Sequence, residues 1–156
     1  MIKFHEIGMY KNAVNIPYCK VSDTITDGVK NGYAVTYSET TKTVSLPTAT
    51  TAKGSDLTIV MNVLDKPELK SPDDYVVDAG EYARLFRLDS LANRMLDMND
   101  LALTTAYASV SVGDKLVAGT DGKWSKSASV DGYSAYLEVI EKTSFCGNGL
   151  LVKVHA

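Results

Sequence analysis

Residues 57–64 read LTIVMNVL, and they form the strongest apolar run of the 156-residue chain. Eight residues are few for a helix, and the run is rich in β-branched side chains, so it predicts a strand buried in the core. The segment that follows, residues 66–74, contains Pro67 and Pro72 and has no useful periodicity. It is therefore predicted to be a connection, and it is our candidate boundary between two halves of the chain.

Further strands are expected on both sides of this run. Residues 33–37 are aromatic and β-branched, and residues 42–46 alternate polar and apolar side chains before Pro47. The turn signals Asp27-Gly28 and Asn31-Gly32 precede them, since glycine accepts a positive φ at low cost. The other predicted strands are residues 101–107, 133–140 and 150–154, and the last two should pair as an antiparallel hairpin. Residues 110–117 contain a Gly-Asp turn, and residues 121–124 carry the signal of a tight hairpin.

Residues 82–96 fit two patterns. Tyr82, Phe86 and Leu88 are consistent with one face of a strand, whereas Leu85, Leu91 and Met95 extend the set into a helical stripe. We favour a strand over 81–88 because its neighbours are β, and a helical turn near 89–95 stays open.

The predicted fold is mainly β: a small β-barrel or sandwich, formed as one domain or as two related β-units, with at most one short helix. Residues 1–25 fit no clear period and contain Ile16-Pro17, so we expect an extended N-terminal arm or edge segment. Residues 26–156 are the predicted β-rich domain, with a sub-boundary near 66–74. An α/β fold is excluded because no long helical segments alternate with the strands.

An internal similarity suggests the two units. Val29, Gly32, Val35 and Lys42 recur 81 positions later as Val110, Gly113, Leu116 and Lys123. Residues 63–66 also resemble residues 139–142, at an offset of 76. The two interpretations are a duplicated β-unit and a chance reuse of common β-residues.

Composition excludes several classes of partner. Apolar residues make up 45% of the chain, the net charge is −3, and the lysines and arginines are scattered, so no nucleic-acid surface is indicated. No apolar run approaches the ~20 residues that cross a membrane, and the first residues do not resemble a secretory signal. We therefore expect neither membrane insertion nor secretory export. Cys19 and Cys146 are typical of thiols in a reducing compartment, and a disulfide between them stays open.

Two carboxylate groups were considered as chemical sites. Asp73, Asp74, Asp78 and Glu81 form an acidic cluster that could bind a hard cation such as calcium, but a solvated turn is the favoured interpretation. Glu138 and Glu141 lie three apart in a predicted strand and should face opposite sides, which argues against an acid–base pair.

The remaining candidates involve aromatic and histidine side chains. Trp124 with Tyr107, Tyr133 and Tyr136 could form a sugar-binding platform, or these residues could belong to a core or an interface. His5 and His155 are too few for a familiar zinc site, and no nucleophile or phosphate-loop motif occurs. We therefore predict no catalytic, cofactor-binding or metal-binding residues, and no enzyme activity.

The second half of the chain resembles a group of phage proteins. The motifs are residues 77–86 (VDAGEYARLF), residues 112–116 (VGDKL), residues 121–124 (DGKW) and a closing hairpin at 135–154. Together they resemble the capsid decoration proteins, also called head auxiliary or cement proteins, of tailed bacteriophages. The resemblance covers roughly residues 26–154.

The resemblance implies a structural virion protein. Such a protein is synthesised in the host cytoplasm, binds the exterior of the capsid and reinforces contacts between major capsid proteins, often as a homotrimer. The family has no catalytic residues to transfer and no known role for the two cysteines. The alternative function is a carbohydrate-binding module or a head-fibre or adhesion domain, suggested by Trp124 and the nine tyrosines.

Overall fold

The computed structural model of the chain describes residues 1–5, 15–63, 66 and 71–156. Its strands are β1 (Ile2–Phe4), β2 (Asn15–Val21), β3 (Ala34–Ser38), β4 (Thr43–Ser45), β5 (Leu57–Val60), β6 (Tyr82–Arg87), β7 (Met95–Asn99), β8 (Lys115–Ala118), β9 (Trp124–Ser127), β10 (Tyr136–Thr143) and β11 (Gly149–His155). The described residues also contain the 3-10 turns η2 (Thr51–Lys53), η3 (Pro72–Asp74), η4 (Asp89–Leu91), η5 (Asp100–Ala102) and η6 (Tyr107–Ser109). No α-helix occurs among the described residues, so the mainly β prediction is confirmed.

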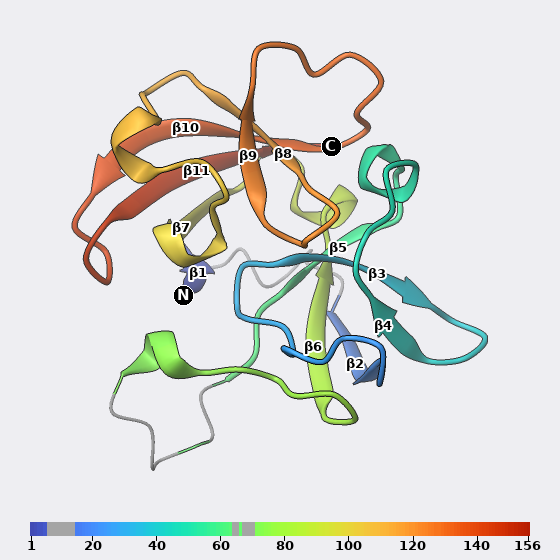
Figure 1. The fold of residues 1–156 in the computed structure, drawn as a ribbon. Helices are drawn as coiled ribbons and strands as arrows, with labels where there is room; N and C mark the ends of the chain where they lie inside the picture. The colour runs from blue at the N-terminus through green and yellow to red at the C-terminus, as the bar shows by residue number, and fades with distance from the viewer. Residues whose placement is uncertain (6–14, 64–65, 67–70) are drawn as a thin grey trace.

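The strands form a barrel and a sheet (Figure 1). The first five strands after β1 close into a barrel in the order β2-β4-β3-β5-β6. The second half forms a six-stranded sheet in the order β1-β7-β11-β10-β8-β9. The predicted hairpins are confirmed: β8 pairs antiparallel with β9, and β10 with β11.

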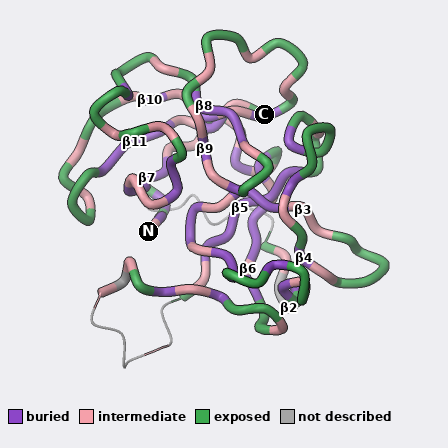
Figure 2. The backbone as a smooth tube through the Cα atoms, in the orientation of Figure 1, coloured by how far each residue is buried: buried purple, intermediate pink, exposed green. Residues whose placement is uncertain are grey.

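The buried residues, coloured purple along the backbone in Figure 2, form two apolar clusters. One lies inside the barrel, and the other lies between the outside of the barrel and the inner face of the sheet. Strand β5 contributes to both, because Ile59 faces the cluster shared with the sheet whereas Val60 faces the barrel interior. Residues 57–60 are all buried because this strand is covered on both faces and needs no polar side. The strand predicted over 57–64 ends at Val60, and Val63 is exposed.

The barrel and the sheet contain the same five-stranded unit. In the first unit β3 pairs with β4 and β5, β5 pairs with β6, and β6 pairs with β2. In the second unit β8 pairs with β9 and β10, β10 pairs with β11, and β11 pairs with β7. A parallel contact joins β2 to β4 in the first unit, and an isolated parallel bridge joins Leu103 to Trp124 in the second. The shared pairing pattern supports the interpretation of two related β-units.

Backbone hydrogen bonds at the equivalent turns repeat as well. Gly32 N–H donates to the Val60 carbonyl at 2.8 Å, and Gly113 N–H donates to the Val139 carbonyl at 2.8 Å. Both glycines have positive φ, +95° and +86°. The offset of 81 therefore aligns true equivalents, but Val139 corresponds to Val60, so the predicted match of 63–66 with 139–142 is wrong.

The structure also corrects the predicted boundaries. Strand β6 closes the first barrel, so the two units meet at residues 88–94, and 66–74 lie inside the first unit. The expected N-terminal arm is built into both units where it is described, with β1 on the edge of the sheet and β2 in the barrel. Pairing in the sheet and the barrel satisfies the backbone N–H and C=O groups of these segments, which an extended arm would leave without partners in the protein. Residues 6–14 lie outside the described part.

Two local predictions have different outcomes. Residues 82–87 are a strand, as favoured, and the turn left open after it is η4. The strand expected at 101–107 is wrong, because this segment contains part of η5, the start of η6 and one bridge at Leu103. Ala102 and Leu103 are buried although they belong to no strand. Apolar content alone therefore gave a false prediction of a strand.

Candidate functional site

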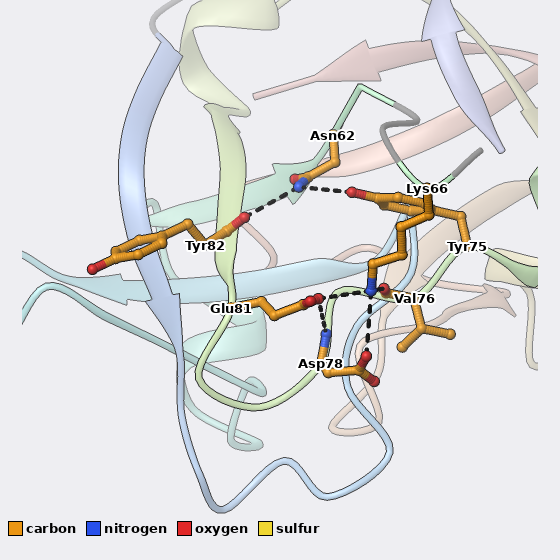
Figure 3. Close-up of polar contacts among 7 residues, drawn as sticks. All are labelled: Asn62, Lys66, Tyr75, Val76, Asp78, Glu81 and Tyr82. Atoms are coloured by element: carbon orange, nitrogen blue, oxygen red, sulfur yellow. Dashed lines mark hydrogen bonds and ion pairs between the residues drawn. The ribbon is translucent and has the colours of Figure 1, made fainter. Parts of the chain in front are cut away.

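Two members of the acidic cluster, Asp78 and Glu81, form ion pairs with Lys66 (Figure 3). The Lys66 ammonium donates to the Val76 carbonyl at 2.9 Å, to Glu81 Oε2 at 2.9 Å and to Asp78 Oδ2 at 3.3 Å. Its hydrogen bond to Glu81 raises the pKa of Lys66 above its usual value. The protein's own ammonium thus supplies the positive charge that a bound cation would supply.

The other half of the cluster lies elsewhere. Asp73 Oδ1, in η3, accepts a hydrogen bond from Asn99 Nδ2 at 2.7 Å. Among the described residues, no three histidine, cysteine, aspartate or glutamate side chains gather as a metal site would require. The calcium hypothesis therefore finds no support in the placement of Asp73, Asp78 and Glu81.

Asn62 anchors the same loop from the other side. Its Oδ1 accepts the Arg84 N–H at 2.6 Å, and its Nδ2 donates to the Tyr82 carbonyl at 3.2 Å. Its backbone N–H donates to Asn31 Oδ1 at 2.6 Å. Sequence patterns missed Asn62 and Lys66 as functional residues, although a single polar residue inside an apolar run is a signal for such a contact.

These contacts frame an exposed surface that we name the insertion face: Val63, Lys66, Glu81 and Tyr82. The side chains of Val63 and Tyr82 are 66% and 62% exposed, which is unusual for large apolar groups in this chain. A shallow hollow of about 290 Å³ is lined in part by Tyr82, Tyr75 and Lys66. The insertion face thus combines two exposed apolar side chains with the Lys66–Glu81 ion pair.

The two glutamates of β10 behave differently from the prediction. A β-bulge between Val139 and Glu141 shifts the register, so Glu138 pairs with Lys153 and Glu141 with Leu151. Lys153 and Leu151 are two apart on β11 and therefore share a face, which places their partners Glu138 and Glu141 on the same side of the sheet. Glu138 is already engaged, because its Oε2 lies 2.7 Å from His155 Nε2.

The aromatic residues considered as a sugar platform do not gather around Trp124. Trp124 is fully buried, and its Nε1–H donates to the Gly32 carbonyl at 2.8 Å. Tyr136 stacks on His155 with ring centroids 4.6 Å apart, while the hydroxyl of Tyr107 donates to the backbone at Gly149. Of the two interpretations, the burial of Trp124 in the core is therefore the one that the structure bears out.

The two cysteines are far from equivalent. Neither is in a disulfide: Cys19 is buried in the barrel and Cys146 is exposed. Burial raises the pKa of the Cys19 thiol to about 11. Because the thiolate is the nucleophile, burial both blocks access to Cys19 and suppresses its reactive form.

Native protein should therefore react with a maleimide at Cys146 only. At pH 8 a thiol with so high a pKa is thiolate in roughly one molecule in a thousand, so Cys19 should be labelled only after unfolding. Intact mass measured over time gives the number of labels, and Cys146→Ser should remain unlabelled until denaturant is added. Fast labelling of native Cys146→Ser would contradict the closed barrel.

Comparison of the chain with protein-family models, with curated proteins and with solved structures gives no match. No helix among the described residues is long and apolar enough to span a membrane. The likeness to phage decoration proteins therefore rests on the sequence motifs and is treated as a proposal.

Proposed function

We propose that this chain is a structural virion protein that binds the exterior of a tailed-phage capsid and reinforces contacts between major capsid proteins. The motifs at 77–86, 112–116 and 121–124 support this function, and so does a fold with a large interior core and an adhesive surface. By the same resemblance we propose assembly as a homotrimer, which light scattering of the purified protein would test.

The observation that favours a specific contact surface is a difference between the two units. In the second unit β10 and β11 are joined by residues 144–148, whereas in the first unit β5 and β6 are separated by residues 61–81. The strand pairings are the same in both units, but the long connection occurs only in the first. The shared scaffold therefore does not account for it. Loops added to a rigid scaffold are where binding residues concentrate.

The insertion face has the composition of a protein contact. Tyr82 is exposed on β6 and its carbonyl accepts a hydrogen bond from Asn62, while its ring points away from the neighbouring Lys66–Glu81 ion pair (Figure 3). Tyrosine is enriched at the centres of interfaces, where one aromatic side chain can account for much of the binding energy. The Lys66 contacts hold this surface in place before binding, which lowers the entropy cost of association.

Substituting Tyr82→Ser should weaken binding to capsids that lack decoration by about 30-fold, the effect of losing one central aromatic contact of about 2 kcal/mol. Purified protein would be mixed with undecorated heads, and the bound fraction measured by co-sedimentation and imaging of the heads. Folding should be unaffected because the side chain is 62% exposed.

Val112→Ser is the matched control, because Val112 is 63% exposed but lies in the second unit, away from the insertion face. It should bind heads like the unmodified protein. No specific binding by the unmodified protein would overturn the proposed function, and equal loss in both variants would overturn the insertion face as the contact.

A further inference from the structure

A hollow lies at the seam between the two units. It has a volume of about 390 Å³, within the range of small-molecule sites. Its wall combines the β2–β3 connection of the first unit with Asp121 and Lys123, from the β8–β9 turn of the second. We name it the seam pocket.

The seam pocket is held open by the scaffold. Ala34 N–H donates to the Gly122 carbonyl at 2.7 Å, which fixes the β8–β9 turn against the start of β3. Beneath it, the buried Trp124 donates to the Gly32 carbonyl. A ligand would therefore meet a preformed site and would not need to order it.

The floor is apolar. Ile25 is 5% exposed, and Leu46 packs against the barrel core. Tyr33 packs against both core clusters, so its ring is fixed where the two units meet. Such a floor fits the C–H face of a ring-shaped ligand.

The rim is charged but balanced. Lys30 and Lys123 supply two positive charges, and Asp27 and Asp121 supply two negative charges. Two of the four groups are already engaged: the Lys30 ammonium donates to the Asp73 carbonyl at 3.0 Å, and Asp121 Oδ2 accepts a hydrogen bond from the Thr104 hydroxyl at 3.0 Å. Within the described residues, the Asp27 carboxylate has no hydrogen-bond or ion-pair partner. The Lys123 ammonium lies 5.9 Å from the centre of the Tyr33 ring. The Asp27 carboxylate, a hydrogen-bond acceptor, and the Lys123 ammonium, a donor, thus lie on different units beside the same apolar floor.

We infer that the seam pocket binds a neutral polyhydroxylated ligand of mono- or disaccharide size. Balanced charge selects against anions and cations, whereas a carboxylate accepts hydrogen bonds from hydroxyl groups and an ammonium donates to them. The site is distinct from the platform considered around Trp124. The inference is independent of capsid binding, because it uses none of the residues of the insertion face.

The test is a titration of ¹⁵N-labelled full-length chain with maltose, lactose and diacetylchitobiose, followed by amide chemical shifts. At least one sugar should give saturable shifts at residues 27–30 and 121–123, with a millimolar dissociation constant. The double variant Asp27→Asn with Lys123→Met should weaken binding about tenfold or more, as expected when a hydrogen bond to a charged group is lost.

The control is Asp131→Asn with Lys115→Met, which removes the same charges outside the seam pocket and should leave binding unchanged. Three outcomes would overturn the inference: no sugar shifts any amide, the shifts fall outside the seam pocket, or both double variants bind alike. Saturable shifts with inorganic phosphate in place of the sugars would show an anion site and would also overturn it.

Discussion

Trp124→Ala should destabilise the protein by about 4 kcal/mol or more, a large part of the 5–15 kcal/mol that stabilises a typical domain. Trp124 is the largest fully buried side chain and belongs to the cluster between the barrel and the sheet. Its removal leaves a cavity at the seam and deprives the Gly32 carbonyl of its donor. Urea unfolding followed by circular dichroism measures the loss, since the chain has a single tryptophan and the variant has no indole fluorescence.

Trp124→Phe separates the two contributions. Phenylalanine retains an aromatic ring in the cluster but cannot donate to Gly32, so it should cost about 1–3 kcal/mol. A wild-type urea midpoint for Trp124→Ala would contradict the packing of the two units against one shared core. A loss in Trp124→Phe equal to that in Trp124→Ala would instead show that the hydrogen bond, and not the ring volume, stabilises the seam.

The same residue shows what the sequence could and could not predict. The turn before Trp124 and the strand after it follow from local signals: Asp121-Gly122 favours a tight turn, and the flanking segments pair across it. Whether the indole faces solvent or the other unit depends on a carbonyl 92 residues away. Local patterns therefore predicted the hairpin correctly, whereas the choice between a core position and a sugar platform required knowledge of tertiary packing.

The register of β10 could not be predicted from the sequence either. Alternation in β10 places Glu138 and Glu141 on opposite faces only if the strand is regular, and the bulge after Val139 reverses that conclusion. The repeat at an offset of 81 was detectable because glycine turns with positive φ constrain residue type at both copies. The strand after each turn contains no such glycine, so the sequence pattern aligned Val139 with Val63, whereas the backbone hydrogen bonds align it with Val60.

The insertion face was only partly predictable. The acidic residues Asp78 and Glu81 were noted as a cluster, but their partner Lys66 lies across a connection whose path no periodicity describes. Asn62 was counted within an apolar run, where its hydrogen bonds to β6 could not be anticipated. Pairing of distant polar groups is determined by the fold, and single-sequence patterns report the fold only in part.

Gly28→Ala should be nearly as damaging as the loss of Trp124, although it adds a single methyl group. A Cβ at residue 28 would lie 2.5 Å from Val76 Cγ1 and 2.6 Å from the Val77 carbonyl oxygen, and φ is +64°. Residues 76–77 cannot move away from Gly28 easily, since Val29 and Val77 exchange two backbone hydrogen bonds of 2.9 Å. Left-handed strain and overpacking together should cost about 3 kcal/mol in unfolding free energy.

Gly113→Ala is the control for this substitution. Gly113 also has a positive φ, +86°, but no described heavy atom lies within 4 Å of an added Cβ. It should therefore lose only about 1 kcal/mol, the cost of the left-handed backbone alone. The difference between the two variants, measured by urea unfolding under identical conditions, isolates the close approach of residues 76–77 to Gly28. Equal losses would show that this approach relaxes at little cost.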